Sequence, residues 1–560
     1  MIQSRGGQTT LHKCTYLLFL AALTAAAAKA EECTENYIPT PPGYQFTASL
    51  DRWGQSNIDH GLDGRARVGN VYVNSQPIFN LMDEDENNAI YRWVNRFHRK
   101  TRPDVIRKLV LFEQGTEIDE DMLQESERIL RNQSFTSDAA IKVVSRCENV
   151  VDLEIIQKEV WTLLPDLKLK TGGGVSEVGL GFHDANFLGS GNRVGANYNS
   201  DPERDSLSFQ YVGQNLLDSR LRLGLQLEDN SDGHQRLVSL SHPFYAIKTE
   251  RAWGLFLNDE KWEQIFYRYG DEANRLEIKL AEADLWLGRG QPTTDGVMRR
   301  RFGIHYEDTQ YLAGNLPSTP GSRTLVYPYV EWQKIEDEYG VAYNINQINR
   351  AEDLHFGRNF RARFGYSASD NSRFIFAGDF VDTLTSQNKQ LLQAGINWHG
   401  RWNFDENSLE GAMVSLNVDY HRGQTPTRSL YLGVRLTRQW HPDPEDTLLL
   451  GGIQGLRGYP ANFVSGNATY RFTAEQRIFT DLNPLSLFNV GFVAFFDVGR
   501  ASSGEHATND GWLSDVGFGI RLVPDKTDRD RVIHIDVGYP LRKLEGATGP
   551  QFLVEVKQTL

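Results

Sequence analysis

Alternation of apolar and polar side chains dominates residues 166–560. Segments such as "SLSFQYVG", "SRLRLGLQLED" and "SRFIFAGDFVDT" run between turns rich in Gly, Asp, Asn and Pro. Such segments are typical of a transmembrane β-barrel, in which one face of each strand meets lipid. A chain that crosses a bilayer without helices must close its sheet, because the bilayer core has no water for unpaired backbone groups. The pattern predicts an all-β transmembrane barrel over 166–560. It favours this over a soluble β-sandwich, whose polar face is seldom charged and glycine-rich over so many strands.

The parity of the last strands places their charged residues on the face away from lipid. In "NATYRFTAEQRIF", Glu475 lies on the face opposite Phe472. In "FNVGFVAFFDVG", Asp497 and Gly499 lie opposite Phe496. Because side chains alternate strictly along a strand, these acids are expected to point into the lumen. The pattern alone does not fix the number of strands.

Residues 67–165 differ from the rest, because helical and strand patterns follow one another. "RVGNVYVNSQPIF" alternates like a strand, and "NNAIYRWVNRFH" and "IDEDMLQESERILRN" have helical spacing. "DAAIKVVS" and "VVDLEII" then predict a β-hairpin. The order β-α-α-β-β predicts a small α+β domain.

The N-terminal residues have the features of a secretory signal. Residues 1–30 combine Arg5 and Lys13 with the apolar run "TYLLFLAALTAAAA" and an "AKA" cleavage site, so the mature chain is expected to begin at Glu31. Residues 31–66 are rich in Pro and Gly and are expected to form an extended lead-in. No later run of apolar residues is long enough for a transmembrane helix.

The charge and the cysteine content of the chain bear on its partners and on a possible disulfide. The formal net charge of −14 argues against a nucleic-acid partner. Cys33 and Cys147 remain after removal of the signal. Export permits a disulfide between them, and two unpaired thiols are the alternative.

The loop "GGIQGLRGYP" (451–460) centres one arginine among glycines. Arg457 stands between Leu456 and the pair Gly458 and Tyr459. It is either a solvated loop residue or a group that reaches a buried carboxylate.

Five segments carry a resemblance to a known family. "LRGY" (456–459) followed by "FFDVG" (495–499) resembles the two signature motifs of the outer-membrane assembly and secretion superfamily. That superfamily includes BamA, TamA, bacterial surface antigens and the two-partner secretion translocators. "DANFLGSGN" (184–192) resembles its early-barrel hairpin, and "HIDVGYPL" (534–541) resembles its penultimate strand. Residues 67–165, with "ESERILRNQSFTSDAAIKV" (125–143), look like a single POTRA domain.

The resemblance implies a sixteen-stranded barrel and a loop that folds back into its lumen. Arg457 would then form a latch with Asp497, with Glu475 as a second partner. Gly458 would allow a tight backbone, and Leu456 and Tyr459 would belong to the loop motif. Phe495 and Gly499 would belong to the strand motif.

Closure of the barrel would pair its first strand, around 166–173 or 174–183, with the last. In the last strand Phe552, Val554, Val556 and Leu560 share one face. The final residue, Leu560, departs from the aromatic residue on which many outer-membrane barrels end. In the family this seam is weak and can open.

Three functions are consistent with the resemblance. The first is a factor that assists insertion of client proteins into the outer membrane of a Gram-negative cell, with the POTRA-like domain in the periplasm. The second is a secretion translocator of the two-partner type, and the third is a passive pore or surface-antigen barrel. The implied partners are unfolded outer-membrane or secreted polypeptides, outer-membrane lipid, and an accessory periplasmic or inner-membrane protein at the POTRA-like domain.

No motif indicates catalysis. The histidines are scattered without ligand spacing, which argues against a metal site. The chain has no GxSxG, P-loop or dinucleotide fingerprint in a suitable context. We expect neither an enzyme nor a cofactor.

Overall fold

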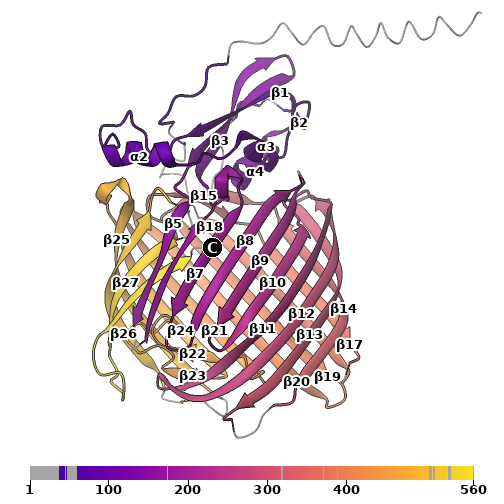
Figure 1. Ribbon diagram of the computed structural model, residues 1–560, viewed down its shortest axis with the longest axis vertical. Helices are drawn as coiled ribbons and strands as arrows, with labels where there is room; N and C mark the ends of the chain where they lie inside the picture. The colour runs from indigo at the N-terminus through magenta and orange to yellow at the C-terminus, as the bar shows by residue number, and fades with distance from the viewer. Residues whose placement is uncertain are drawn as a thin grey trace, which may run out of the picture.

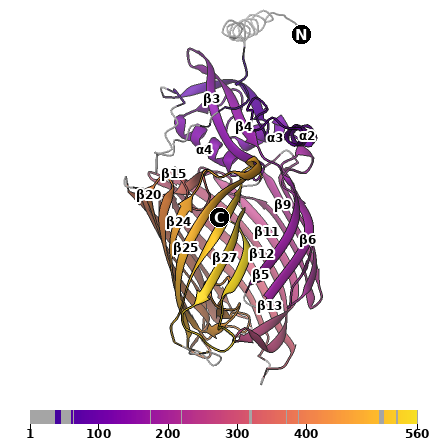
Figure 2. The same cartoon turned by 90° about the vertical axis from the view of Figure 1, so that its left-hand side faces the viewer.

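The computed structural model consists of a small α+β domain seated on one end of a large β-barrel (Figures 1 and 2). It describes residues 37–558 apart from 45, 47–59, 63, 173–174, 218, 317–319, 370, 387–388, 504–507, 509–510 and 528–530. The predicted signal sequence, Cys33 and Leu560 lie outside these residues. Below, the barrel end that carries the small domain is called the domain end, and the opposite end the distal end. No helix in the described part of the chain is long and apolar enough to cross a membrane.

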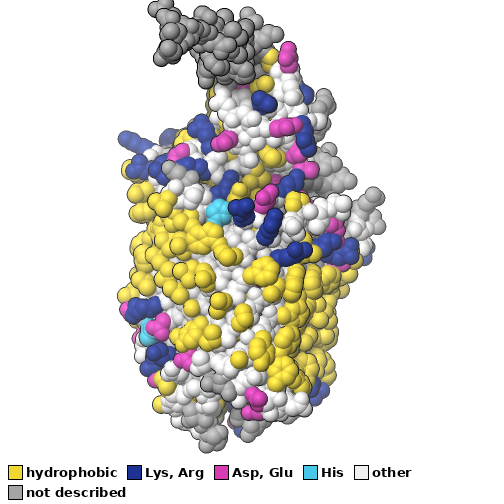
Figure 3. All heavy atoms as spheres, turned by 90° about the vertical axis from the view of Figure 1, so that its right-hand side faces the viewer, with side chains coloured by type: hydrophobic (Ala, Val, Ile, Leu, Met, Phe, Trp, Pro, Cys, Tyr) yellow, Lys and Arg dark blue, Asp and Glu magenta, His cyan; other side chains and the backbone are white. Residues whose placement is uncertain are grey.

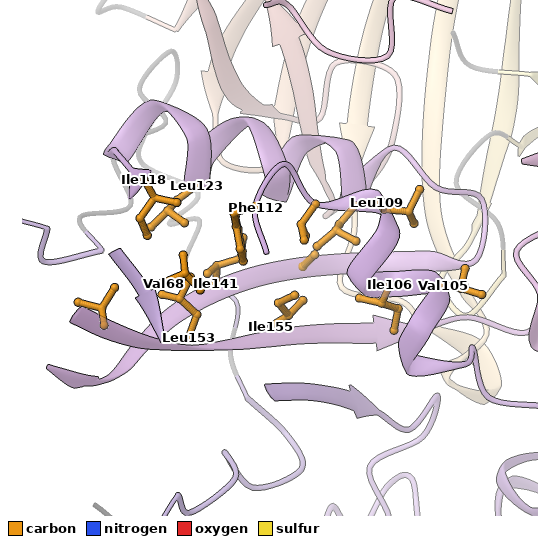
Figure 4. Close-up of a cluster of buried hydrophobic side chains, with 14 of the residues drawn as sticks. Val68, Val105, Ile106, Leu109, Phe112, Ile118, Leu123, Ile141, Leu153 and Ile155 are labelled. Carbon is orange, nitrogen blue, oxygen red and sulfur yellow. The ribbon is translucent and has the colours of Figure 1, made fainter. Parts of the chain in front are cut away.

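The small domain is a four-stranded sheet, in the order β2-β1-β4-β3, with helices on one face. β1 and β4 run parallel, and β3 pairs antiparallel with β4. Its elements are β1 (Ala66–Gln76), α2 (Ala89–Phe97), α3 (Pro103–Leu109), β2 (Glu117–Ile118), α4 (Glu120–Arg131), β3 (Thr136–Cys147) and β4 (Val150–Glu159). The two predicted helices and the hairpin are present, and α3 and β2 are additional. Ile106 of α3 and Leu123 of α4 pack on Ile141 and Ile155 of the sheet and form its core (Figure 4).

The described part of the lead-in covers the other face of this sheet. Tyr37 stacks on Tyr72 of β1 with ring centroids 3.8 Å apart. Glu154 of β4 accepts hydrogen bonds from the Tyr37 hydroxyl at 2.9 Å and from Thr40 Oγ1 at 2.6 Å. Cys147, at the end of β3, is disulfide-bonded.

His60 ties the segment before β1 to helix α4. Its Nε2 lies 2.9 Å from Glu127 Oε1, and its Nδ1 contacts Glu120. Burial disfavours the charged ring, but hydrogen bonds and attraction from Glu127 and Glu120 outweigh it and raise the pKa of His60 above its ordinary 6.5. Because the folded-state pKa is raised, the charged ring stabilises the fold fully below pH 6.5. This stabilisation is lost as the pH rises through the raised pKa.

We therefore expect protection of the amides around His60 to fall at alkaline pH. The measurement is the amide exchange rate of the native protein divided, at each pH, by the rate of the same amide in His60→Gln. Taking this ratio removes the intrinsic pH dependence of exchange. The ratio of the two exchange rates should increase from acidic to alkaline pH. A ratio that stays constant would show that the charge on His60 does not hold this segment.

The barrel is a single closed sheet of twenty antiparallel strands, β5 to β14, β17 to β21 and β24 to β28. The predicted all-β barrel is confirmed, but the expected count of sixteen strands is wrong. That count came from the family resemblance, because alternation shows that a segment is a strand and not whether it extends the wall. The wall begins at Leu163, three residues before the predicted boundary of 166.

The wall strands differ widely in length. Those next to the point of closure, β5–β7, β27 and β28, have 8–10 residues, whereas β11–β13 have 18–23. The first ten are β5 (Leu163–Gly172), β6 (Val175–Asp184), β7 (Arg193–Ser200), β8 (Asp205–Leu216), β9 (Leu221–Asn230), β10 (Gly233–His242), β11 (Arg251–Arg268), β12 (Asp271–Thr293), β13 (Gly296–Gly314) and β14 (Arg323–Glu336). The others are β17 (Asn359–Ser367), β18 (Arg373–Ser386), β19 (Gln390–Asn403), β20 (Ser408–Thr425), β21 (Arg428–Trp440), β24 (Ala468–Phe479), β25 (Phe488–Ser502), β26 (Leu513–Pro524), β27 (Arg531–Pro540) and β28 (Gln551–Gln558).

The outer surface carries a belt of apolar side chains between bands richer in charge (Figure 3). Phe492, Phe496 and Phe518 are exposed on it, whereas Asp497 and Asp515 on the same strands are buried. The parity assigned from the sequence to the last strands therefore agrees with the observed burial. A belt of this kind fits contact with lipid hydrocarbon.

The turn 185–192 seats the small domain on the wall. It contains the 3₁₀ helix η1 (Phe187–Gly189). Gly189 accepts a backbone hydrogen bond from Arg102 at 3.0 Å, and the Asn186 side chain donates to Thr101 Oγ1 at 2.9 Å. The segment that resembles the family's early hairpin is thus one of the contacts between domain and barrel.

Candidate functional site

The loop between β21 and β24, residues 441–467, is called here the distal loop. It contains β22 (Leu448–Leu450) and β23 (Val464–Gly466), which pair with each other. Leu456, Tyr459 and Phe463 have no exposed surface and pack with Leu513 and other buried residues. The Tyr459 hydroxyl donates to the carbonyl of Arg542 at 2.9 Å. A solvated loop would not bury these side chains, so the motif is a packed part of the lumen.

Arg457 reaches from this loop to the inner face of the wall. Its Nε and Nη2 donate to the two carboxylate oxygens of Asp497 in β25 at 2.7 and 3.0 Å. Its Nη1 donates to Glu475 of β24 at 2.8 Å. The guanidinium also stacks on the ring of Phe495, 3.5 Å from the centroid. Arg457 is only 8 % exposed, so the pairs are shielded from solvent.

Further charges extend this pair into a network. Asp536 of β27 lies 3.6 Å from Arg457 Nη1 and receives hydrogen bonds from Arg521 of β26 at 2.6 and 3.2 Å. Arg477 Nε donates to Glu475 at 2.9 Å. The sequence analysis named Asp497 and Glu475 as partners of Arg457 and assigned no role in the latch to Asp536, Arg477 and Arg521. Their inward parity could have found them, since all three alternate with apolar residues on the last strands.

Two glycines allow the loop backbone to touch the wall. A Cβ at Gly458 would lie 2.5 Å from Asp515 Cβ and 2.9 Å from the Tyr539 carbonyl carbon. A Cβ at Gly538 of β27 would lie 2.6 Å from the backbone of Arg457. Gly499 of the strand motif likewise packs against Leu456. The role of Gly458 is close approach.

We expect Gly458→Ala to destabilise the barrel by about 1–3 kcal/mol, because an extra methyl group in a filled site forces the backbone apart. Denaturant unfolding of the protein in lipid vesicles measures the change. Gly549→Ala is the matched control, since a Cβ at Gly549 would meet nothing within 4 Å. Equal stability of the two variants would contradict the close approach.

A second segment enters the lumen from the domain end. Residues 337–358, between β14 and β17, are called here the lumen hairpin and contain β15 (Tyr339–Tyr343) and β16 (Ala351–His355). Its tip reaches the arc β24–β27, although β18–β21 lie between β17 and β24 in the wall. Ile348 packs with Phe479, Val523 and Val532, and its carbonyl accepts a hydrogen bond from Asn489 at 3.1 Å. The sequence reading did not identify this hairpin.

The lumen hairpin also contacts the small domain. Arg131 of α4 donates to both carboxylate oxygens of Asp353 at 2.8 and 2.7 Å, and both side chains are buried. Arg128 of α4 stacks on Tyr339, 3.7 Å from the ring centroid. The hairpin therefore connects helix α4 to the wall.

The two inserted segments meet at one wall residue. Arg477 donates to the carbonyl of Ile345 in the lumen hairpin at 2.7 Å and to Glu475, the partner of Arg457. A cavity of about 670 Å³ lies between them, lined by Gln347 of the hairpin and Ile453 of the distal loop among others. A continuous set of contacts thus runs from α4 to the distal loop.

The seam between β28 and β5 differs from its neighbours. Among the residues that the structure describes, β28 pairs with β27 at eight positions and β5 pairs with β6 at ten, whereas β28 and β5 pair at Val554 and Thr171 alone. Phe552 and Val556 of β28 are exposed on the outer face. The predicted seam strands are therefore neighbours, joined by little backbone pairing.

In the part of the chain that the structure describes, no group of three or more His, Cys, Asp or Glu side chains could hold a metal ion. Whether the chain lacks enzymatic activity stays a prediction.

The chain was compared with protein-family models, with curated proteins and with solved structures. No protein-family model and no curated protein matches the sequence. The fold is similar to BamA from Haemophilus ducreyi lacking POTRA domains 1–3, at 13 % identity over 88 % of this chain and 85 % of that chain, with a TM-score of 0.39. It is similar to CdiB from Acinetobacter baumannii at 12 % identity, over 88 % of this chain and 74 % of that chain, with a TM-score of 0.44. It is also similar to the FrpB iron transporter from Neisseria meningitidis at 8 % identity, over 76 % of this chain and 87 % of that chain, with a TM-score of 0.39. These similarities carry no argument about function, which rests on the geometry described above.

Proposed function

We propose that this chain is an outer-membrane barrel of a Gram-negative cell that assists insertion of client proteins through its seam. The small domain faces the periplasm and receives the client, and the distal end faces outward. The reaction is assembly of a β-sheet in lipid and needs no catalysis, nucleotide or cofactor. The client's own folding into the membrane drives it.

The weak seam between β28 and β5 carries this proposal. A strand edge with unpaired N–H and C=O groups is a template for another strand. With one paired position among the described residues of this seam, we expect little backbone hydrogen bonding to be broken before β28 and β5 separate. Each freed edge can then pair with an incoming client strand.

The sheet of the small domain supports the first encounter. β3 is an edge strand of 12 residues that pairs with β4 on one side. An extended polypeptide can add to such an edge by β-augmentation, in which main-chain hydrogen bonds give affinity without requiring one sequence. An accessory periplasmic protein can use the same edge.

Secretion through the lumen is the second candidate, favoured by the cavity of about 670 Å³ between the distal loop and the lumen hairpin. This route requires both segments to leave the lumen. Insertion at the seam requires neither to leave.

A disulfide across the seam separates the two functions. Thr171→Cys with Val554→Cys joins the facing positions of β5 and β28, and Ile535→Cys with Val554→Cys joins β27 to β28 as the matched control. Quantitative proteomics of outer-membrane and culture-supernatant fractions is the readout. We expect only the seam disulfide to deplete a set of barrels from the membrane, with recovery under reductant.

Loss of a single protein from the supernatant, with the membrane fraction unchanged, would support secretion instead. If neither fraction changes when the protein is absent, a passive barrel is the better account.

A further inference from the structure

Helix α2 presents an apolar face that is largely exposed, with Trp161 stacking on Trp93 at a centroid distance of 6.4 Å. Ile90, Trp93 and Phe97 are 69 %, 54 % and 62 % exposed. At 100° per residue they fall within an arc of roughly 60° on the helix. The opposite face is held firmly, since Tyr91 stacks on Phe79 with centroids 4.1 Å apart and Asn95 donates to the Phe79 carbonyl at 2.8 Å. The exposed face is thus fixed in orientation.

The helix lies at the rim of the barrel (Figures 1 and 2). The Tyr91 hydroxyl donates to the carbonyl of Leu485, in the turn between β24 and β25 that contains η2 (Pro484–Ser486). Leu482 and Leu485 of this turn are themselves exposed. Exposed apolar side chains of α2 and of this turn therefore lie at the same rim of the barrel.

Basic residues surround this face. Residues 89–103 contain five Lys or Arg and no Asp or Glu, in a chain whose net charge is −14. All five are exposed: Arg92, Arg96, Arg99, Lys100 and Arg102. At 100° per residue Arg96 projects roughly 90° from the centre of the apolar arc and Arg92 roughly 130° from it, on the side of the helix away from Tyr91. An apolar face with Trp and Phe, flanked by Arg and Lys, is the pattern of a helix that lies in a bilayer interface.

We propose that α2 is an interfacial helix that inserts Ile90, Trp93 and Phe97 into the lipid leaflet at the domain end and binds anionic headgroups through its basic residues. The inference rests on the membrane location proposed above and not on client handling. A lipid surface fits better than a protein partner, because the face lies at the rim of the lipid-facing wall and all five charged residues from 89 to 103 are basic, although residues 83–86 before the helix and Asp104 after it are acidic. The helix would fix the small domain against the membrane.

Site-directed spin labelling of the full-length protein in nanodiscs tests this. Labels at Trp93→Cys and Phe97→Cys report collisions with oxygen, which partitions into lipid, and with a water-soluble nickel chelate. Phe518→Cys, 65 % exposed on the outer wall, is the lipid reference, and Glu117→Cys in the small domain is the water reference. We expect labels on α2 to gain oxygen collisions and lose nickel collisions relative to Glu117→Cys.

The headgroup is tested by comparing phosphatidylglycerol-containing nanodiscs with phosphatidylcholine nanodiscs. The lipid-like signal should be stronger with phosphatidylglycerol, and Arg92→Gln with Arg96→Gln should abolish the difference. An equal signal in both lipids would overturn the role of the basic residues.

Two other results would overturn insertion. If the α2 labels collide with nickel as often as Glu117→Cys does, while Phe518→Cys shows the collisions of a lipid-exposed label, then α2 is in water. The proposed membrane location of the barrel is not affected by that result. If α2 labels are shielded from both reagents, a second copy of the chain covers the face.

Discussion

Arg457→Ala is expected to lower the free energy of unfolding by about 3–5 kcal/mol, the usual cost of removing one partner from a buried ion pair. The substitution leaves Asp497 and Glu475 facing each other without the guanidinium that both contact. It also removes the cation that stacks on Phe495. Denaturant unfolding of the barrel in vesicles measures the loss, and cleavage of the distal loop by added protease reports whether it has left the lumen.

Two variants make this result specific. Arg361→Ala breaks a more exposed pair with Asp379 and should cost at most about 1 kcal/mol, because exposed ion pairs contribute little. Arg457→Lys keeps the charge but cannot reproduce the planar two-point contact with Asp497, so its loss should be intermediate. A loss for Arg457→Ala no larger than for Arg361→Ala would contradict the latch.

Replacing the lumen hairpin, residues 337–358, by a short Gly-Ser turn is expected to produce a large increase in ion conductance. The hairpin crosses the lumen near the domain end and packs Ile348 against the far wall. Its removal leaves the distal loop as the remaining obstruction that we describe. Single-channel recording in planar bilayers measures the change.

Asp353→Ala is the companion variant, because it keeps the hairpin but removes its two hydrogen bonds to Arg131 of α4. Brief openings are expected in place of a steady conductance, since the tip contacts with Arg477 and Asn489 remain. Unchanged conductance after deletion would mean that the distal loop alone seals the barrel.

The sequence predicts the wall of this protein well, because each strand has one face in lipid and one in the lumen. Strict alternation placed Asp497 and Glu475 on the inner face, where the structure finds them beside Arg457. The same parity applied to Asp536 would have added a third carboxylate. The predicted pairing of Arg457 with these acids came from the family resemblance. Parity alone does not show which residue a long loop brings into the lumen.

Alternation does not distinguish a wall strand from a hairpin inside the lumen. β15 and β16 are short strands like many others, and only their pairing with each other removes them from the wall. The strand count of sixteen was wrong because it was taken from the family resemblance, since local sequence does not fix which strands pair in the closed sheet. Helix α3 was missed because its seven residues span barely two turns.

The twenty-strand wall has a geometric consequence for what the barrel must contain. Barrel diameter grows roughly in proportion to strand number, so twenty strands enclose about 1.6 times the cross-sectional area of sixteen. One inward-folded loop that spans a sixteen-strand bore would leave more than a third of this wider bore unfilled by the same scaling. The lumen hairpin occupies part of that added area, so a twenty-strand wall with the distal loop as its one insert would leave a wider opening than the two inserts leave together.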